Sequence, residues 1–516
     1  MILFSWVIFV IGLIFPVFVY LVKFFLEFST ETAFYTFRDP YYLEGIIFTF
    51  RTILFSVLLS LVLGSASALV LLSLPDRVSR PLGLVLVLSV LSPPFVGAIG
   101  YRMIAVGLNI DDWTSLGIAF VQSLNLFPIV GILLESAVRN IDDTLIQSAK
   151  LYGLTKLRTF SRIVLPLIGP ALVNILFFCI ASSLADIGSP LIFEERRFLS
   201  LIIFNLITDK DPFGTGMYLV FMYLLMFGLA FVWLRKYMGS IFTETVSSGY
   251  REARLSFGVF LKSLLFVIFT IILILSYVPQ LYVILMSFTT FSGEITFNNY
   301  LEAVQNPSFG RSFVISTSLA LLSTVSALAL SFFVAWKNKK TSKSVCVRLL
   351  DFFSFIPIVF PAVLLAFIMV LAYKGTPLDN TKVPLLLLFI VYTLRKLPQG
   401  TRVFSGLLKQ LGSELEDAGR NFGISSVKIV TRIYIPALFQ IFLRLFVNFF
   451  TLSLFETSTS LIIPIEEKWF PLSKLVYHHY SEPENFFPTC AILSMVLLLS
   501  YFSAIILYKS ADHRWF

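Results

Sequence analysis

Two acidic residues interrupt stretches that otherwise carry no charge. Asp186 lies in residues 185–190 (ADIGSP), and Glu456 lies in residues 455–460 (FETSTS). A carboxylate in a hydrocarbon environment is energetically costly, so such residues usually face a transport pathway or a partner. We therefore hypothesise that Asp186 and Glu456 line a translocation path or form a gate. The alternative interpretation is that both acids cap or brace the helices that contain them.

Other residues offer little chemistry by their type and spacing. Residues 477–480 (YHHY) could contribute to a hard-cation site, although a solvated loop or a surface for a partner protein explains them more simply. The three cysteines are far apart and predict neither a metal site nor a disulfide framework. The sequence contains neither an H-E-x-x-H nor a G-x-x-x-x-G-K-[ST] motif. We therefore expect no membrane enzyme, no cofactor and no ATP hydrolysis in this chain.

The composition places these residues in an integral membrane protein. Of the 516 residues, 57% are hydrophobic and 13% are charged, and the mean hydropathy is +0.89. A soluble domain carries about 25% charged residues, so an ordinary soluble enzyme and a disordered chain are both excluded. The net charge of +9 comes from short basic clusters between apolar runs, which is typical of cytoplasmic loops. We expect no nucleic acid partner.

Twelve stretches are long and apolar enough to cross a bilayer, which predicts an all-α integral membrane protein. They lie near residues 5–26, 46–73, 83–106, 115–138, 170–192, 217–234, 260–286, 312–335, 352–373, 383–398, 440–463 and 487–508. Arg395 and Lys396 interrupt the tenth stretch. With the N-terminus placed in the cytoplasm, the loops on that side hold 27 of the 39 lysines and arginines. This bias predicts a multi-pass protein of the cell inner membrane with both termini in the cytoplasm. Helices should kink at Pro93-Pro94 and at Pro361.

The chain contains an internal repeat. Residues 147–166 (QSAKLYGLTKLRTFSRIVLP) align with residues 417–436 (DAGRNFGISSVKIVTRIYIP) without a gap, at an offset of 270. A second pair of matching stretches covers residues 50–69 and 310–329. Self-similarity of this kind indicates a duplicated architecture. The predicted units are two homologous six-span halves, residues 1–240 and 260–516, and a cytoplasmic linker, residues 241–259.

Each copy of the longer repeat is predicted to form a helix, a glycine turn and a second helix on the cytoplasmic side. Gly153 and Gly423 follow the first helix, where a left-handed backbone favours glycine. In the second copy the second helix is expected to run until Pro436. The predicted caps are Asp142 or Asp143 and Thr155 in the first copy, and Ser413 with Glu416 and then Ser425 or Ser426 in the second. The plainer alternative is that these glycines and prolines only end one helix and start the next.

The two copies resemble the cytoplasmic signature of the permease subunits of binding-protein-dependent ABC importers. That signature reads E-A-A, three residues, Gly, nine residues and then I-x-L-P. Gln147 stands where the family has an acid, and Gly419 stands where it has its last alanine, so a salt bridge from the first copy is not expected. The matching positions are Gln147, Ser148, Ala149, Gly153, Ile163 and Pro166, and then Asp417, Ala418, Gly419, Gly423, Ile433 and Pro436.

The resemblance implies a type I ABC importer permease fold with two coupling loops, residues 142–166 and 412–436. Each loop would insert into a groove on one of two copies of a separate ATPase, which would bind the ATP. An extracytoplasmic solute-binding protein would deliver the cargo. Residues 185–190 are similar to an element of ferric-iron permeases, and a fused double permease of this length also resembles the thiamine group.

Two sets of alternatives stay open. Thiamine, polyamine and phosphonate are alternative cargoes within the same class of importer. An ion-coupled secondary transporter is the alternative class, because it can also have twelve spans in two halves. Such a transporter would not need the paired helix–glycine–helix loops, and it would normally place several ionisable residues near the middle of the membrane.

Overall fold

The computed structural model describes residues 2–90, 92, 94–109, 114–208, 214–238, 258–341, 344–358, 360–379, 381–411, 419, 421–422, 424–480 and 482–510. These residues form a helical bundle, and the only bridge between extended segments in them joins Thr289 and Ile295. The predicted all-α class is confirmed. Most of the predicted linker, residues 241–257, lies outside the described part.

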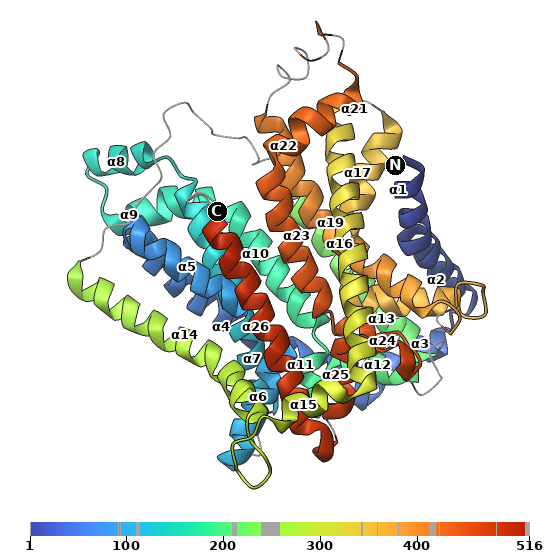
Figure 1. Ribbon diagram of the computed structural model, residues 1–516. Coiled ribbons are helices and arrows are strands. Elements are labelled where there is room, and N and C mark those ends of the chain that lie inside the picture. Colours follow the sequence, from blue (N-terminus) through green and yellow to red (C-terminus); the bar gives the residue numbers. More distant parts are fainter. Residues whose placement is uncertain are drawn as a thin grey trace.

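The helices of the first half follow one another with short connections (Figure 1). They are α1 (Ile2–Phe9), η1 (Val10–Ile14), α2 (Phe15–Leu26), α3 (Thr30–Arg38), α4 (Pro40–Ser73), α5 (Asp76–Val90), α6 (Pro94–Gly107), α7 (Thr114–Arg139), α8 (Asp143–Leu151), α9 (Lys156–Thr159), η2 (Phe160–Val164), α10 (Leu165–Ala185), α11 (Gly188–Ile192), α12 (Leu199–Thr208) and α13 (Thr215–Met238).

The second half repeats this order. Its elements are α14 (Val259–Ser287), α15 (Asn298–Gln305), α16 (Pro307–Thr341), α17 (Val345–Phe355), η3 (Ile356–Ile358), α18 (Ala362–Tyr373), α19 (Pro384–Gln410), α21 (Ser426–Ile429), η4 (Val430–Tyr434), α22 (Ile435–Ala437), α23 (Phe439–Leu454), α24 (Ser458–Ile462), η5 (Glu467–Trp469), α25 (Leu472–Tyr480), η6 (Pro483–Asn485) and α26 (Phe486–Ser510).

Seven helices in the described part are long and apolar enough to span a membrane, and an eighth span results if the bent pair α5 and α6 counts as one. The predicted number of twelve is therefore not confirmed. α18 has only 12 residues, about 18 Å of helix, whereas a bilayer core is about 30 Å thick. α19 has 27 residues but carries Arg395 and Lys396 in its middle. Its charges, rather than its length, make it a poor match to hydrocarbon.

Proline breaks the third span of each half, as predicted. α5 and α6 meet at an angle of 82°, and α6 begins at Pro94. In the second half, α17 and η3 end before Pro361, which then serves as the N-terminal cap residue of α18. Proline has no backbone N–H to donate inside a helix, so a helix that begins at a proline loses no hydrogen bond.

Three π-helical turns in the described residues each end two residues before a proline. They are η1, η2 and η4, which precede Pro16, Pro166 and Pro436. A proline ring clashes with the carbonyl four residues earlier, and the wider π turn relieves that clash. The chain therefore stays helical through Pro166 and as far as Ala437. In the second copy this helical segment ends at Ala437, one residue after the predicted Pro436.

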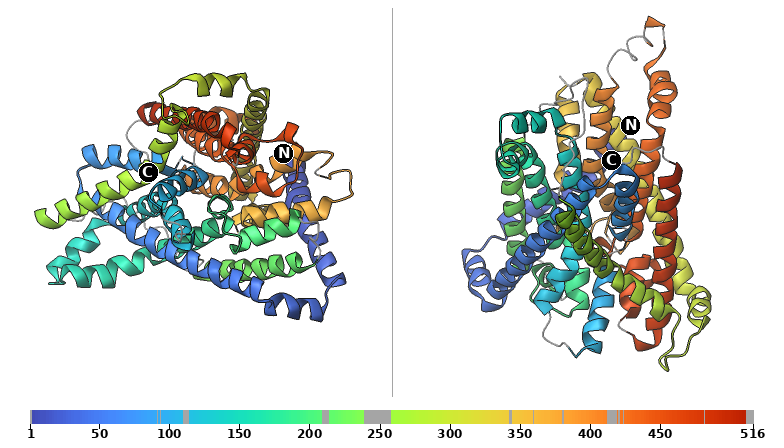
Figure 2. Two further views of the ribbon diagram at one scale, coloured as in Figure 1. Left: turned by 90° about the horizontal axis from the view of Figure 1, so that it is seen from below. Right: turned by 90° about the vertical axis from the view of Figure 1, so that its left-hand side faces the viewer.

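The first spans are exchanged between the two halves. α4 packs along α7, and α16 packs along the equivalent α19, but α2 packs on α18 of the other half and α14 packs on α6 and α4. Figure 1 shows the dark blue α1 and α2 beside the second half, and Figure 2 shows the same arrangement from below. A Cβ at Gly100 of α6 would lie 2.4 Å from the Cβ of Pro279 of α14, so these helices touch through their backbones. The main core runs through both halves as one cluster.

Candidate functional site

The first predicted coupling loop forms a helix, a glycine turn and a second helix. α8 begins after Asp142, whose carboxylate accepts a hydrogen bond from the N–H of Thr144 at 3.0 Å. Gly153 has a φ of +74°, in the left-handed region that favours glycine. Thr155 directly precedes α9. These features of the local prediction are confirmed, and Asp142 rather than Asp143 is the cap.

The second predicted coupling loop is described only in part. In both loops one backbone bond closes the turn: Leu154 N–H donates to the Ala149 carbonyl at 3.0 Å, and Ile424 N–H donates to the Gly419 carbonyl at 2.9 Å. The two bonds stand at the offset of 270, so the described remainder matches the first loop. The predicted residues that lie outside the described part are Ser413, Glu416, Asp417, Ala418 and Gly423.

One face of α8 is anchored and its tip is exposed. The anchor is an apolar cluster separate from the main core, made of Leu72, Val138, Ile141, Ile146, Val164 and Ile168. At the tip, the residues Leu151 and Tyr152 are each 88% exposed, and Phe422, the equivalent of Tyr152, is 83% exposed. Figure 1 shows α8 and α21 at the same end of the bundle. Two apolar tips therefore project from one end of the protein.

Among the remaining signature positions, those that the structure describes in both copies are arranged alike. Gln147 and Ser148 are exposed on α8, and the Gln147 amide donates to the Asp143 carboxylate at 2.6 Å. Ile163 and Ile433 are half-buried, while Pro166 and Pro436 are exposed. Sequence reasoning missed the buried residue that follows each isoleucine, Val164 in η2 and Tyr434 in η4.

Lys339 fastens the second coupling segment to the spans. Its ammonium group, at the end of α16, donates to the Leu408 carbonyl of α19 at 2.7 Å and to the Tyr434 hydroxyl of η4 at 3.3 Å. Its Nζ also lies 5.2 Å from the centroid of the Tyr434 ring, within cation–π range. α16, α19 and the coupling segment are thereby joined at one side chain.

Asp186 lies in the break between α10 and α11. Its Oδ2 accepts a hydrogen bond from the Gln122 amide at 3.1 Å, and its Oδ1 accepts from the N–H of Ser189 at 3.2 Å. Its backbone carbonyl accepts from the Ser200 hydroxyl at 2.9 Å. The carboxylate thus caps the short helix α11 and keeps part of its surface accessible.

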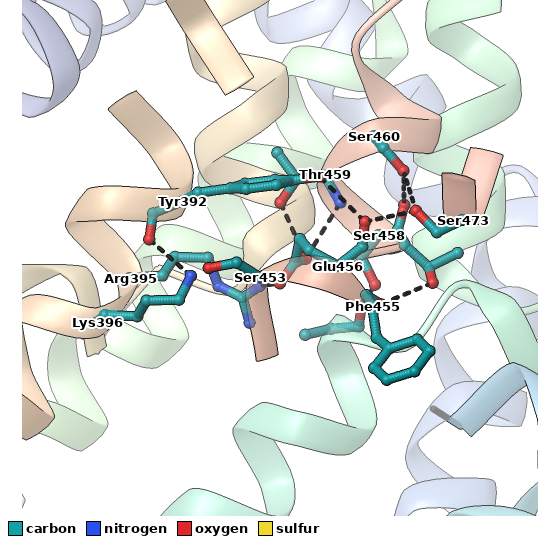
Figure 3. Close-up of polar contacts among 12 residues, drawn as sticks. Tyr392, Arg395, Lys396, Ser453, Phe455, Glu456, Ser458, Thr459, Ser460 and Ser473 are labelled. Carbon is teal, nitrogen blue, oxygen red and sulfur yellow. Dashed lines mark hydrogen bonds and ion pairs between the residues drawn. The ribbon is translucent and has the colours of Figure 1, made fainter. Parts of the chain in front are cut away.

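Glu456 occupies the equivalent break between α23 and α24 (Figure 3). Its carboxylate forms an ion pair with Arg395 and accepts a hydrogen bond from the Thr459 hydroxyl at 3.0 Å. Its backbone carbonyl accepts from the Tyr392 hydroxyl at 3.2 Å and the Ser473 hydroxyl at 2.9 Å. Both acids therefore make the capping contacts of the alternative interpretation, which leaves a role in transport as a prediction.

The two breaks share one hydrogen-bond skeleton. The N–H three residues after each acid donates to its carboxylate, from Ser189 in the first half and Thr459 in the second. A serine hydroxyl binds each acid's carbonyl, from Ser200 and Ser473. The breaks also touch each other, because the Ser458 hydroxyl donates to the Ala185 carbonyl at 2.9 Å. Asp186 and Glu456 therefore stand on adjacent elements where the two halves meet.

Charge distinguishes the two breaks. Beside Glu456 are the guanidinium of Arg395 and the ammonium of Lys396, which is 5% exposed and donates to the Tyr392 carbonyl at 2.9 Å. At the offset of 270, the positions of Tyr392 and Arg395 correspond to Gln122 and Asn125. The second half thus carries a cation, Arg395, where the first half carries the amide of Asn125. Sequence reasoning treated Arg395 and Lys396 only as an interruption of a span.

The two adjacent histidines end α25. The ring of His478 lies 5.9 Å from that of Phe470, edge to face. Burial lowers the pKa of the His479 imidazole from its usual value, which disfavours the charged form. In the part of the chain that the structure describes, no three His, Cys, Asp or Glu side chains come together as a metal site.

Two helical halves share one core, and the described parts of the two predicted coupling loops lie at the same end of the bundle. This arrangement defines a permease of the type I ABC importer fold. The chain belongs to the family described as binding-protein-dependent transport system inner membrane component, which it matches twice, over residues 60–240 and 327–515. One match falls in each predicted half. This family identifies a multi-pass membrane transport permease rather than an enzyme.

Two curated relatives show similarity to this chain. It is 24% identical over 409 residues to the ferric transport system permease protein FbpB of Actinobacillus pleuropneumoniae, which covers 74% of this chain and 59% of the relative. It is 24% identical over 445 residues to the putative ferric transport system permease protein FbpB 1 of Haemophilus influenzae, covering 79% and 67%. The chain thus spans less than two thirds of the length of the first relative.

Proposed function

We propose that this chain is the permease of an ATP-driven importer that moves ferric iron delivered by an extracytoplasmic binding protein. The observation that carries the proposal is the anchored helix–glycine–helix segment of the first half and the described part of its repeat in the second half, with their apolar tips at one end of the bundle. The printed names of the two relatives support ferric iron as the cargo. Thiamine, polyamine and phosphonate are the alternative cargoes.

In this proposal the two segments are the coupling loops. Each would dock on one of two copies of a separate ATPase, which binds and hydrolyses the ATP, while this chain holds no cofactor. The anchors support that role, because a docked tip can transmit force only if its base is fixed. The cluster around Ile146 holds the first segment, and Lys339 ties the second to α16 and α19. Closure of the ATPases would then rock the halves between inward-facing and outward-facing states.

The proposed pathway runs between the two breaks that contain Asp186 and Glu456. Their contact through Ser458 and Ala185 supports this placement, because movement of one half against the other must change it. The coupling end, where α1 begins and α26 ends, would face the cytoplasm of the cell inner membrane, with both termini inside (Figure 1).

The test is uptake of radiolabelled ferric iron by cells with and without this gene, in a strain that lacks other ferric importers. We expect uptake that requires the gene and is lost in a variant with aspartate at both Gly153 and Gly423, while membrane insertion is unchanged. Normal iron uptake without the gene would contradict ferric iron as the cargo and direct the assay to thiamine.

A second measurement separates the classes of transporter. Affinity purification of the tagged chain from membranes should retain an ATPase if the chain is an importer subunit. An ion-coupled secondary transporter would purify without one, and its uptake would collapse with the ion gradient rather than with depletion of ATP.

A further inference from the structure

We propose that Asp186 and the side-chain oxygens of Gln122 and Ser189 form a transient subsite for a hard, oxygen-preferring cation in the permease. The inference rests on the proposed function, because it assigns this subsite to the cargo on its way through the chain. The proposal distinguishes the two acids, which otherwise occupy equivalent places. It makes Asp186 the ligand and Glu456 a structural partner of Arg395.

The first argument is the difference in charge compensation. Glu456 is paired with Arg395, so its charge is satisfied within the chain. Among the described residues, no lysine or arginine forms an ion pair with Asp186, although its carboxylate lies in the interior between α10 and α11. A buried charge is costly unless a counter-charge accompanies it. A cation that enters from outside would supply that counter-charge.

The second argument is an orphaned amide oxygen and a buried hydroxyl at the same place. The Gln122 amide nitrogen donates to Asp186 at 3.1 Å and to the Ser183 carbonyl at 3.2 Å, which fixes the orientation of the amide. The Gln122 Oε1 is therefore left without a hydrogen-bond partner on a side chain that is 3% exposed. The Ser189 hydroxyl is fully buried and interacts with the same carboxylate, which leaves its oxygen lone pairs available to a cation. A buried polar atom without a partner, such as the Gln122 Oε1, is an exception in folded proteins.

The donor set fits a passing cation rather than a resident one. Carboxylate, amide and hydroxyl oxygens are the ligands that hard cations prefer. One carboxylate and two neutral oxygens bind more weakly than several carboxylates would, and a transport path must release what it binds. Water or groups of the cargo would fill the remaining coordination positions.

The test uses the full chain in nanodiscs of zwitterionic lipid, titrated with Tb³⁺, a luminescent hard trivalent cation. We expect Asp186→Asn to weaken the tightest Tb³⁺ site at least tenfold and Glu456→Gln to change it less than twofold. Equal losses in the two variants, or none in Asp186→Asn, would overturn the proposal.

A second variant keeps the Asp186 carboxylate and supplies a counter-charge for it within the chain. Asn125→Arg places a guanidinium at the position that Arg395 occupies in the other half, 270 residues later. We expect this variant to lose Tb³⁺ affinity as Asp186→Asn does, with an unchanged melting temperature and elution volume. Retained affinity in a folded Asn125→Arg protein would count against the subsite.

Iron uptake by the same variants separates this inference from the proposed function. If wild-type cells import ferric iron while Asp186→Asn keeps its Tb³⁺ affinity, the subsite is wrong and the importer proposal stands. If wild-type cells import no iron but Tb³⁺ binding depends on Asp186, the cation subsite stands and the cargo assignment is wrong.

Discussion

Substitutions at Gly153 can separate two properties of the proposed coupling loop: the left-handed backbone of its turn and the space for a side chain in the docking groove. Gly153 has a φ of +74°, and a Cβ built on it would meet no atom within 4 Å. Substitution there therefore meets no steric obstacle inside the chain and changes only the preferred backbone conformation. A left-handed backbone is unfavourable by about 1–2 kcal/mol for alanine, but asparagine tolerates it far better.

This difference predicts that Gly153→Ala weakens ATPase binding more than Gly153→Asn does, although asparagine is the larger residue. If the ATPase binds only the left-handed turn, Gly153→Ala must restore that turn at a cost of about 1–2 kcal/mol, which raises the Kd for the ATPase about 5–30-fold. The larger Gly153→Asn should raise it less than about threefold. The measurement is a binding titration of labelled ATPase against each variant in nanodiscs, with membrane insertion as the control. If Gly153→Asn binds more weakly than Gly153→Ala, space in the docking groove decides affinity and our reasoning about the backbone is refuted.

Three further predictions concern the anchors and the central ion pair. Ile146→Ala should loosen α8 by about 2–4 kcal/mol through loss of packing in its cluster, seen as faster amide exchange in residues 143–151 than in an Ile146→Val control. Lys339→Met should leave the Leu408 and Tyr434 oxygens with one hydrogen-bond donor fewer and make amide exchange in residues 426–437 faster. Unchanged amide exchange there would show that Lys339 does not hold the second coupling segment in place. Arg395→Gln alone should destabilise the protein by about 3 kcal/mol, because it leaves the Glu456 charge unpaired. Thermal melting should show a smaller loss of stability in the double variant Arg395→Gln with Glu456→Gln. Equal melting temperatures for the single variant and the wild type would mean that the ion pair contributes nothing to stability.

The local features of the coupling loops could be predicted because they depend on neighbouring residues. Asp142 caps α8 through the N–H two residues later, and Gly153 supplies a conformation that other residues resist. The repeat at the offset of 270 also relates Asp186 to Glu456, although it does not predict that each lies at a break between two helices. The periodic signals that identify helices and turns are short-range, so one sequence is enough for them.

Other features depend on residues far apart in the chain and could not be predicted. Arg395 looked like an interruption of a span because its partner Glu456 lies 61 residues later. The exchange of α2 and α14 between the halves depends on contacts such as that between Gly100 and Pro279, which no local pattern reports. The number of spans is not confirmed for a related reason. Spans covered by other helices tolerate charges and short lengths that a lipid-exposed helix does not.

The breaks at Asp186 and Glu456 have the same hydrogen-bond geometry but differ in charge. If the proposed function holds, both properties serve transport. The shared skeleton of Ser189 and Thr459, with Ser200 and Ser473, holds both breaks in the same shape, so the halves can move as a symmetric pair. Two uncompensated carboxylates facing each other would repel when empty and would hold a trivalent cation too tightly when loaded. Pairing Glu456 with Arg395 removes one of those charges and leaves the other free. A duplicated permease can thus be symmetric in its mechanics while a single carboxylate meets the cargo.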